Sequence, residues 1–232
     1  MATRIKSKGK LILIRHGQSI YNLQNRFTGW KDVELTDKGV DEAKNAGSIL
    51  KNENISFDLA YTSKLKRAQN TLNLALQEMG HENIPIVENI ALNERDYGDL
   101  IGQNKAEAAE KFGIEQVQIW RRSYDIPPPG GESLKMTCDR TLPYFKSVIL
   151  NNVFIGKNVL VSAHGNSIRA IVKFLFNYDA DTILKTEIGW CEPWLFEFDN
   201  HQNKLIDFKL IGIDMNNSNS NIPFIPKFNY NF

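Results

Sequence analysis

Two histidines of this chain stand in the same local pattern, and that pattern is the clearest chemical signal in the sequence. His16 and His164 each follow a short apolar run and precede a glycine, an amide residue and a serine, in the stretches LILIRHGQS and VLVSAHGNS. A single histidine at a strand end is more often a structural, hydrogen-bonded residue. Two of the chain's four histidines in matched settings, one of them beside Arg15, favour an active site with paired imidazoles.

The apolar runs before these histidines predict two strands that are buried on both faces. A strand with one wet face would alternate apolar and polar residues, whereas Leu11–Ile14 and Val159–Val161 are continuously apolar. In open α/β sheets ligands bind at the carboxyl edge of the strands. Gly17 would allow a sharp turn or the close approach of a ligand there. Both histidines are therefore expected at one ligand-binding edge.

Arg15 and the arginines of three other segments point to an anionic ligand. The guanidinium group offers planar donors that match the oxygens of phosphate and carboxylate. Arg15 ends a buried strand, where an unpaired charge is costly, so it needs an anionic partner. The further candidates are cationic residues that would each, taken alone, read as solvated surface charges: Arg67, Arg95, Lys105, Arg121 and Arg122.

These residue types together predict phosphoryl transfer. A neutral His16 would attack phosphorus while the arginines neutralise the equatorial oxygens and His164 donates a hydrogen bond. Attack requires one free ring nitrogen and a hydrogen-bond acceptor for the other. Glu94, in an irregular charged stretch, is the candidate acid and base for a substrate hydroxyl. A solvated carboxylate is the competing interpretation of that position.

Other chemistries and partners fit poorly. The sequence has no Walker loop and no GxGxxG, no HxH or HxxxH spacing for a metal, and no GxSxG elbow. A net charge of +1 argues against nucleic acid or a membrane surface as partner. No apolar run approaches the ~20 residues of a membrane span, and the N-terminus lacks a signal-peptide core. Cys138 and Cys191 form no CxxC and suggest reduced thiols, so we expect a cytoplasmic protein.

The elements expected around these residues follow the order βαβαβ, a helical insert, then βαββ. That order predicts an α/β fold, a three-layer α/β/α sandwich with a mostly parallel central sheet and one antiparallel edge. Residues 91–150 are expected to form a helical cap over the carboxyl edge, ending in a long helix from Ser133. Thr36 and Ser63 are the expected N-caps of the first two long helices.

One catalytic domain is expected over residues 1–212, followed by an Asn-rich tail over 213–232. The Asn216–Asn221 run is low in complexity and is predicted to be mobile. Phe224, Ile225, Phe228, Tyr230 and Phe232 follow it, and both docking onto the body and disorder stay open for them.

Beyond single residues, several stretches resemble the histidine phosphatase superfamily, whose minimal signature is the triplet Arg15-His16-Gly17. The fuller combination is similar to the 2,3-bisphosphoglycerate-dependent phosphoglycerate mutases, and the phosphoglycerate mutase-like fold is implied with it. The matching stretches are Leu13–Trp30 (LIRHGQSIYNLQNRFTGW), Leu35–Gly47, Ala60–Arg67 (AYTSKLKR), Leu92–Gly98 (LNERDYG), Gln116–Arg122 (QVQIWRR) and Ser162–Arg169 (SAHGNSIR).

The resemblance implies a role for each matching residue. His16 would become the phosphohistidine, Glu94 would move the proton, and Arg15, Arg67 and His164 would hold the transferring phosphoryl group. The residues implied in substrate binding are Gly17, Gln18, Ser19, Asn22, Thr28, Gly29, Arg95, Tyr97, Lys105, Arg121, Arg122, Gly165 and Asn166.

The implied reaction is the interconversion of 3-phosphoglycerate and 2-phosphoglycerate in glycolysis and gluconeogenesis, primed by 2,3-bisphosphoglycerate and needing no metal. The alternative within the same site is a phosphohydrolase of small phosphoesters. Three features depart from the pattern: Gln18 stands where many members have Glu, the Pro127–Gly131 loop is short, and Ile188–Pro193 replaces a run of small residues. The short loop leaves a homodimer and a monomer both open.

Overall fold

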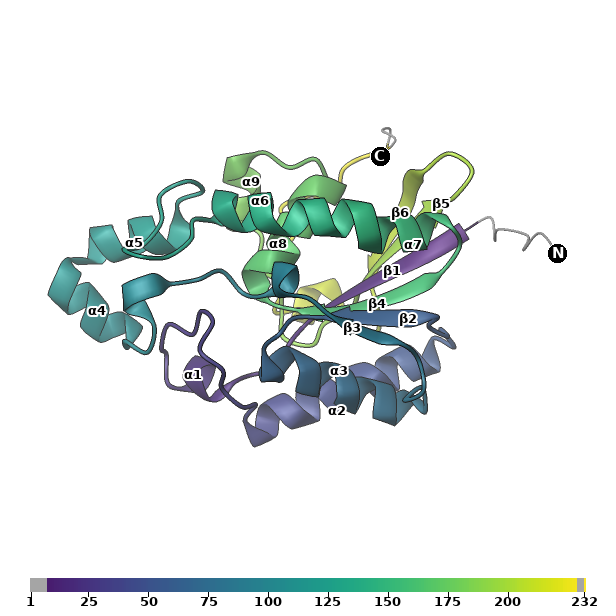
Figure 1. The fold of residues 1–232 in the computed structure, drawn as a ribbon, viewed down its shortest axis with the longest axis horizontal. Coiled ribbons are helices and arrows are strands. Elements are labelled where there is room, and N and C mark those ends of the chain that lie inside the picture. Colours follow the sequence, from purple (N-terminus) through teal and green to yellow (C-terminus); the bar gives the residue numbers. More distant parts are fainter. Residues whose placement is uncertain (1–7, 229–231) are drawn as a thin grey trace.

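A single six-stranded sheet forms the centre of the molecule in the computed structural model, which describes residues 8–228 and 232. Its strand order is β3-β2-β4-β1-β5-β6 (Figure 1). The strands are β1 (Lys8–Arg15), β2 (Leu59–Thr62), β3 (Ile86–Glu88), β4 (Asn158–Ala163), β5 (Trp194–Asp199) and β6 (Lys204–Leu210). The two strands that carry the matched histidines, β1 and β4, are neighbours at the middle of this sheet.

The sheet is mostly parallel, as expected. β1 pairs with β4, β4 with β2 and β2 with β3, all in parallel, and Arg15 is paired with Ala163 at the shared carboxyl edge. β5 runs antiparallel to both β1 and β6. The expected antiparallel edge is present, because the β5–β6 hairpin places β5 beside β1 and leaves β6 as the edge strand.

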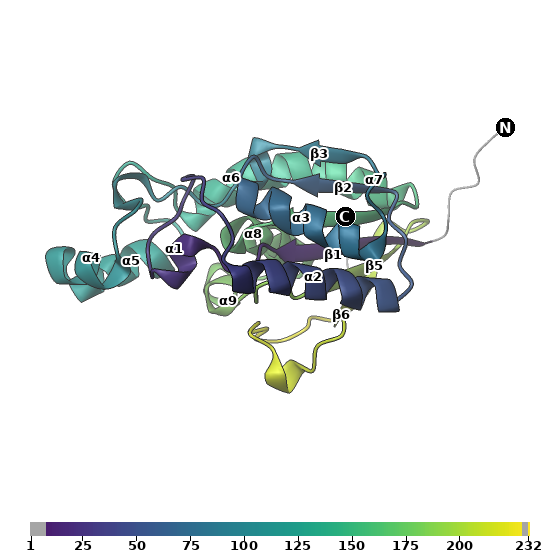
Figure 2. The same cartoon turned by 90° about the horizontal axis from the view of Figure 1, so that it is seen from below.

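Helices cover both faces of the sheet, so the predicted three-layer sandwich is confirmed (Figures 1 and 2). On one face lie α2 (Asp37–Asn52) and α3 (Lys66–Met79), which pack against Ile12, Ile14 and Leu160. The opposite face is covered by four helical segments: α6 (Leu134–Tyr144), the π-helix η3 (Phe145–Leu150), α7 (Asn151–Phe154) and α8 (Gly165–Leu175).

The cap is smaller than predicted. Only α4 (Lys105–Phe112) and α5 (Ile114–Arg122), with the short α1 (Ile20–Leu23), project beyond the carboxyl edge. The predicted long helix does begin at its N-cap Ser133, but it belongs to the sandwich. Its residues Leu134 and Phe145 are buried in the core cluster that also contains strands β1 and β4. The helix that begins at Leu134 therefore packs its apolar side chains against the sheet and does not form part of the cap.

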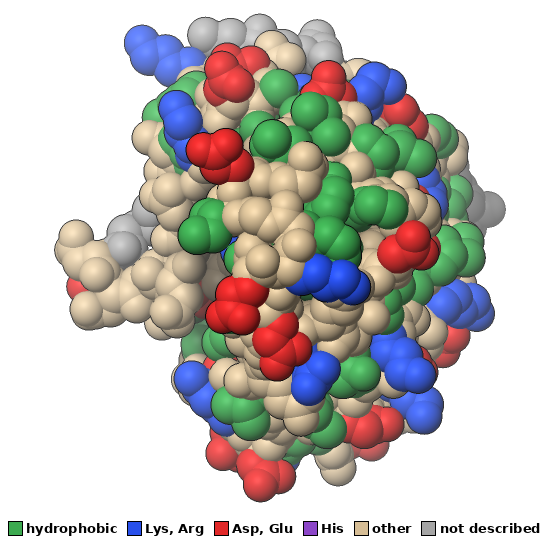
Figure 3. All heavy atoms as spheres, turned by 90° about the vertical axis from the view of Figure 1, so that its left-hand side faces the viewer, with side chains coloured by type: hydrophobic (Ala, Val, Ile, Leu, Met, Phe, Trp, Pro, Cys, Tyr) green, Lys and Arg blue, Asp and Glu red, His purple; other side chains and the backbone are tan. Residues whose placement is uncertain are grey.

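The end of the molecule that bears α4 and α5 has a mixed surface. Positively charged lysines and arginines and negatively charged carboxylates are interspersed with apolar side chains there (Figure 3). No helix among the described residues is long and apolar enough to cross a membrane.

One of the two predicted helix caps is confirmed. Thr36 accepts a hydrogen bond from the amide of Gly39 and caps α2. Ser63 does not cap α3, which begins at Lys66 with Leu65 as a cap that makes no side-chain bond. The Ser63 hydroxyl accepts from the Leu65 amide and bonds to His164, and the extended backbone of Leu65 delays the start of the helix to Lys66.

The tail after Gly212 contacts the body at several points. It forms the turn η4 (Met215–Asn217), and then Ser218–Asn221 hydrogen-bond to the loop that precedes β5. Farther on, Phe224 lies against Tyr178 and Phe228 against Phe176. Tyr230, which the sequence also offered for docking, lies outside the described residues.

Candidate active site

A cavity of about 130 Å³ opens at the carboxyl edge, between the sheet and the cap. Residues from ten or more segments of the chain line it, and most of them were predicted from the sequence. The lining residues are Arg15, His16, Asn22, Arg26, Phe27, Thr28, Gly29, Arg67, Glu94, Tyr97, Lys105, Arg121, Arg122, Gly165, Asn166, Arg169, Glu187 and Ile188.

His16 lies at the floor of this cavity with a defined ring orientation. Its Nδ1 is 2.7 Å from the carbonyl oxygen of Gly17. Because a carbonyl oxygen only accepts, Nδ1 carries the proton and Nε2 keeps its lone pair. Nε2 in turn lies 3.4 Å from Nε of Arg67. The unprotonated nitrogen therefore accepts a hydrogen bond from Arg67 and faces the cations that would bind an anion.

The same surroundings keep His16 neutral. Burial lowers the pKa of His16 well below 6.5, and the charges of Arg67 and Arg15 add to this effect, while the bond to Gly17 opposes it. Only the neutral imidazole has a nitrogen able to attack phosphorus. At neutral pH the ring is therefore held in its reactive form.

Arg67, which is buried, and Arg15, which is half-buried, flank His16 as cations. Arg67 is 0% exposed and donates to the carbonyl oxygens of Gly29 and Lys31, at 2.8 and 3.0 Å. Burial lowers its pKa to about 10, so it stays charged at neutral pH. Arg15 donates one NH1 bond to Ile188, whereas its buried Nε has no partner among the described residues. An unpaired buried donor of a cation calls for an anionic ligand.

His164 lies beside His16, with ring centroids 4.9 Å apart and planes at 60°. Its Nε2 is 2.7 Å from the hydroxyl of Ser63, and its buried Nδ1 has no partner among the described residues. Burial, then Arg67, lowers the pKa of His164 well below 6.5, so this ring is also neutral. When the Ser63 hydroxyl donates to Nε2, the proton sits on Nδ1, which is then free to donate to a ligand.

Glu94 is buried at 8% exposure and has one carboxylate oxygen tied down. Oε1 accepts bonds from the amides of Arg95 and Asn166, at 2.7 and 3.1 Å. A Cβ added to Gly165 would lie 3.8 Å from Oε2 and 3.6 Å from Nε of Arg15. The other oxygen of Glu94 therefore borders the same small space as Arg15, which only the missing side chain of Gly165 leaves open.

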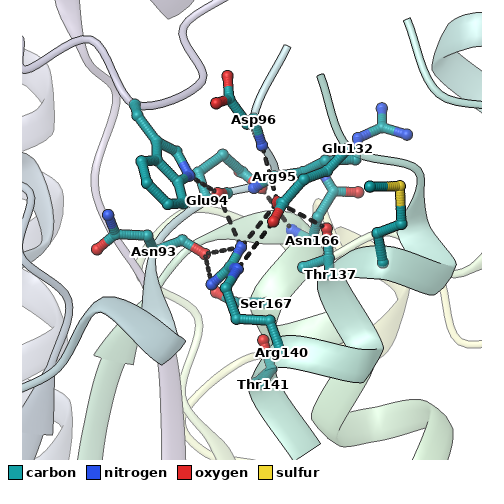
Figure 4. A network of polar contacts seen from close by, with 12 residues as sticks. Asn93, Glu94, Arg95, Asp96, Glu132, Thr137, Arg140, Thr141, Asn166 and Ser167 are labelled. Atoms are coloured by element: carbon teal, nitrogen blue, oxygen red, sulfur yellow. Dashed lines mark hydrogen bonds and ion pairs between the residues drawn. The ribbon is translucent and has the colours of Figure 1, made fainter. Parts of the chain in front are cut away.

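A polar network behind the site holds the backbone of Glu94 (Figure 4). Arg140 on α6 pairs with Glu132 through two bonds of 2.9 Å and donates to the carbonyl oxygens of Asn93 and Glu94. Burial would raise the pKa of Glu132, but the bonds from Arg140 and from the Asp96 amide bring that pKa below its usual value. Trp30 adds a 2.6 Å bond to the Glu94 carbonyl.

The outer wall of the cavity carries more cations and one carboxylate, Glu187, that pairs with two of them. Burial lowers the pKa of Lys105, and so does the nearby charge of Arg121. Arg122 pairs with Glu187 at 2.6 Å, and Glu187 also pairs with Arg169 at 2.5 Å. Burial opposes ionisation of Glu187, but these arginines hold its pKa below the usual range. A ligand anion that reaches Arg122 must therefore compete with Glu187.

Five residues predicted for the site do not line the cavity, although His164, one of them, touches His16. The amide of Gly17 donates to Thr71, and a Cβ here would lie 2.3 Å from the Gly39 carbonyl, so close packing explains this glycine. Gln18 bonds to Thr36, and Ser19 caps α1.

Arg95 is the fifth of these residues and supports the wall from behind. It is 1% exposed and donates to the hydroxyl of Tyr97 and to the carbonyl of Arg121. Burial would raise the pKa of Tyr97, but the charge of Arg95 lowers it. Arg95 thus positions two lining residues.

Sequence reasoning missed six residues that the structure places in or against the site. Arg169 had a signal, because it lies one helical turn after Gly165 on α8. Arg26, Phe27 and Ser63 lie within the stretches that resemble the family but had no assigned role, and no local pattern marked Glu187 or Ile188 as functional.

Among the described ranges, no group of three or more His, Cys, Asp or Glu side chains lies close enough to hold a metal ion. The arrangement offers a neutral imidazole nucleophile, the buried cation Arg67 and the half-buried cation Arg15, a second imidazole with an unpaired ring nitrogen, and a buried carboxylate. This set suits transfer of a phosphoryl group through a histidine.

Comparison with known proteins supports this chemistry. Residues 11–210 match the model of the histidine phosphatase superfamily, branch 1. Among solved structures, a mycobacterial glucosyl-3-phosphoglycerate phosphatase shares 23% identity, with a TM-score of 0.72 over 88% of this chain and 97% of the other. A phosphoglycerate mutase from Bacillus anthracis shares 25% identity, with a TM-score of 0.67 over 89% and 92%.

Two relatives are much more similar in sequence. Both are named 2,3-bisphosphoglycerate-dependent phosphoglycerate mutase. The one from Parvibaculum lavamentivorans is 54% identical over 190 residues, which cover 82% of this chain and 90% of the relative. The one from Nitrobacter hamburgensis is 56% identical, covering 82% and 92%. This chain therefore belongs to the histidine phosphatase superfamily and, within it, to the 2,3-bisphosphoglycerate-dependent phosphoglycerate mutases.

Proposed function

We propose that this chain interconverts 3-phosphoglycerate and 2-phosphoglycerate in glycolysis and gluconeogenesis, through a phosphohistidine at His16. The observation that carries the proposal is the fixed tautomer of His16, whose unprotonated Nε2 faces Arg67 and accepts a hydrogen bond from it. The names of relatives at 54–56% identity favour the mutase over the phosphohydrolase alternative.

Two groups of cations in the cavity suit a substrate with an anion at each end. Arg15, Arg67 and His164 surround His16 and would hold the transferring phosphoryl group. On the outer wall Lys105, Arg121 and Arg122 would bind the carboxylate and the remaining phosphate, with help from Asn22, Thr28, Gly29, Tyr97, Gly165 and Asn166.

Glu94 would act as the acid and base for the substrate hydroxyl. Its Oε1 is fixed by two backbone amides, so Oε2 is the oxygen available to a ligand. Oε2 borders the space left by Gly165, next to Arg15. A hydroxyl next to a phosphate on His16 and Arg15 would therefore lie within reach of a proton acceptor.

The residues present also fit 2,3-bisphosphoglycerate. Nε of Arg15 and Nδ1 of His164 are buried donors without partners in the described chain, which is what a phosphate in this position would satisfy. When bound, this compound supplies the phosphoryl group that primes His16. Proton transfer and charge neutralisation then fall to protein side chains, so we propose that no metal takes part.

We further propose that residues 1–212 form the catalytic domain and that the protein acts in the cytoplasm on small phosphoglycerates. Neither nucleic acid nor a membrane is proposed as a partner. A homodimer and a monomer both remain compatible with this function.

The test is an assay with 3-phosphoglycerate and a catalytic amount of 2,3-bisphosphoglycerate, in which 2-phosphoglycerate and inorganic phosphate are both measured. Isomerisation should exceed phosphate release and should persist in EDTA. Dominant phosphate release would favour the phosphohydrolase, and loss of isomerisation in EDTA would contradict the metal-free mechanism. His16→Ala should abolish both isomerisation and an acid-labile phosphoryl label from 2,3-bisphosphoglycerate. A label that persists in His16→Ala would refute the nucleophile.

A further inference from the structure

The loop of residues 187–192, just before β5, holds Arg15 from two sides. The carbonyl of Ile188 accepts from NH1 of Arg15 at 2.8 Å, and the amide of Cys191 donates to the backbone carbonyl of Arg15 at 2.9 Å. The ring of Trp190 lies 5.5 Å from the Arg15 guanidinium carbon. Any displacement of this loop therefore moves the cation next to His16.

The C-terminal tail fastens the same loop from its outer side. The carboxylate of Glu192, 5% exposed, accepts four hydrogen bonds from three successive tail residues. The donors are the Ser218 hydroxyl (2.6 Å), the Asn219 amide (2.7 Å), and the Ser220 amide and hydroxyl (3.1 and 2.5 Å). We refer to residues 218–221 as the tail strap.

The tail strap also bonds to the loop at two further points. The Ser220 hydroxyl, which donates to Glu192, accepts from the amide of Gly189 at 2.8 Å. Asn221 and Glu187 exchange two backbone bonds of 2.9 Å. Ser220 therefore links Gly189 to Glu192 within the loop. Asn221 holds the backbone of Glu187, whose carboxylate pairs with Arg122 and Arg169.

Close packing and backbone conformation show that the loop needs this support. A Cβ on Gly189 would lie 2.3–2.7 Å from the carboxylate atoms of Glu192, so the backbone rests directly on that group. Cys191 has a φ of 53°, in the left-handed region that is strained for a residue other than glycine. Such a conformation persists only where surrounding contacts impose it.

We propose that Glu192 is a positioning residue, which acts through the tail strap to hold the 187–192 loop and, with it, Arg15 in the geometry that phosphate binding requires. Glu192 does not line the cavity, so it would act through Arg15 rather than on the substrate. This inference rests on the proposed function only in its use of phosphoglycerate turnover as one readout.

Glu192→Gln is the informative substitution, because it keeps the shape of the side chain and replaces one acceptor oxygen by a donor. At least one strap donor would then face an amide NH₂ group. Misplacing a positioned group by about 1 Å can cost about 100-fold in rate. We expect kcat/KM for 3-phosphoglycerate to fall about 10- to 100-fold, and the Kd of inorganic phosphate to rise about tenfold.

The experiment compares wild type, Glu192→Gln, Ser220→Ala and the double variant, each as the full chain and well below its unfolding temperature. Asn219→Ala is the matched control, since Asn219 contributes only its backbone amide to Glu192. Turnover of 3-phosphoglycerate and calorimetric binding of inorganic phosphate are measured for each. Both single variants should show the losses, the double variant should lose no more than Glu192→Gln, and the control should stay within twofold of wild type.

The proposal is overturned if folded Glu192→Gln keeps kcat/KM and phosphate affinity within twofold of wild type, or if the losses of the two single variants multiply in the double. Should Glu192→Gln fail to fold, unchanged phosphate affinity in Ser220→Ala overturns it equally. A wild-type chain that shows no mutase activity but binds inorganic phosphate in a Glu192-dependent way would refute the proposed function and support the positioning role.

Discussion

Removal of the Ser63 hydroxyl should impair catalysis through His164. The two groups are buried and 2.7 Å apart, and Nδ1 of His164 has no partner among the described residues. The hydroxyl of Ser63 accepts from the Leu65 amide, so its single proton is available for Nε2. In Ser63→Ala nothing holds the Nδ1–H tautomer that a phosphoryl oxygen needs as a donor.

The size of the effect follows from the cost of the unpaired nitrogen. Leaving a buried acceptor without its partner costs about 1–3 kcal/mol. At 1.36 kcal/mol for each factor of ten, a penalty of this size in the transition state lowers kcat/KM about 5- to 150-fold. We expect most of this loss in the rate at which 2,3-bisphosphoglycerate phosphorylates the enzyme, measured by rapid quench with a labelled phosphoryl group.

Ser162→Ala is the matched control. Ser162 is also fully buried on the neighbouring strand end, but its hydroxyl donates to the Ala68 carbonyl at 2.9 Å and leaves His164 untouched. This variant should lose about 0.5–1.5 kcal/mol of unfolding free energy and keep kcat/KM. The tautomer can be read from two-bond ¹⁵N–¹H couplings of the histidine rings. A proton on Nε2 of His164 in wild type, or a kcat/KM of Ser63→Ala within twofold of wild type, would refute the reasoning.

Three further predictions concern the same cavity. Gly165→Ala should leave the unfolding free energy unchanged or higher by up to about 1 kcal/mol, yet weaken inorganic phosphate binding in calorimetry at least tenfold, since the new methyl lies 3.6 Å from Nε of Arg15; unchanged affinity would place the ligand elsewhere. Glu94→Gln should still accept a phosphoryl label from 2,3-bisphosphoglycerate but turn over poorly, and normal turnover would remove Glu94 from proton transfer. Burial and Arg67 hold the pKa of His16 and of His164 well below 6.5, so below pH 6.5 only the unfolded chain takes up these two protons. Stability should therefore decrease as pH falls below 6.5, by up to about 2.7 kcal/mol per pH unit from these two groups. Urea unfolding between pH 5.5 and 7.5 checks the slope, which His164→Asn should reduce by half of that amount; an unaltered slope would contradict the assignment.

Strands and motifs that depend on residues adjacent in the chain could be predicted from the sequence. The apolar runs Leu11–Ile14 and Val159–Val161 defined the two central strands, because a strand buried on both faces needs no polar alternation. Parallel neighbours end at one edge of a sheet, so the repeated His-Gly pattern was enough to bring His16 and His164 together.

Contacts between distant segments were decided only by the tertiary structure. Ser63 looked like a helix cap, and its bond to His164 spans 101 positions in the chain. Glu187 showed no local pattern, yet it pairs with two arginines of the cavity wall. The composition of the tail indicated only a polar, low-complexity run. It could not show that the buried carboxylate of Glu192 accepts hydrogen bonds from the tail. Local patterns thus determined which residues could do the chemistry, while packing across the sheet edge decided how each is oriented, charged and held.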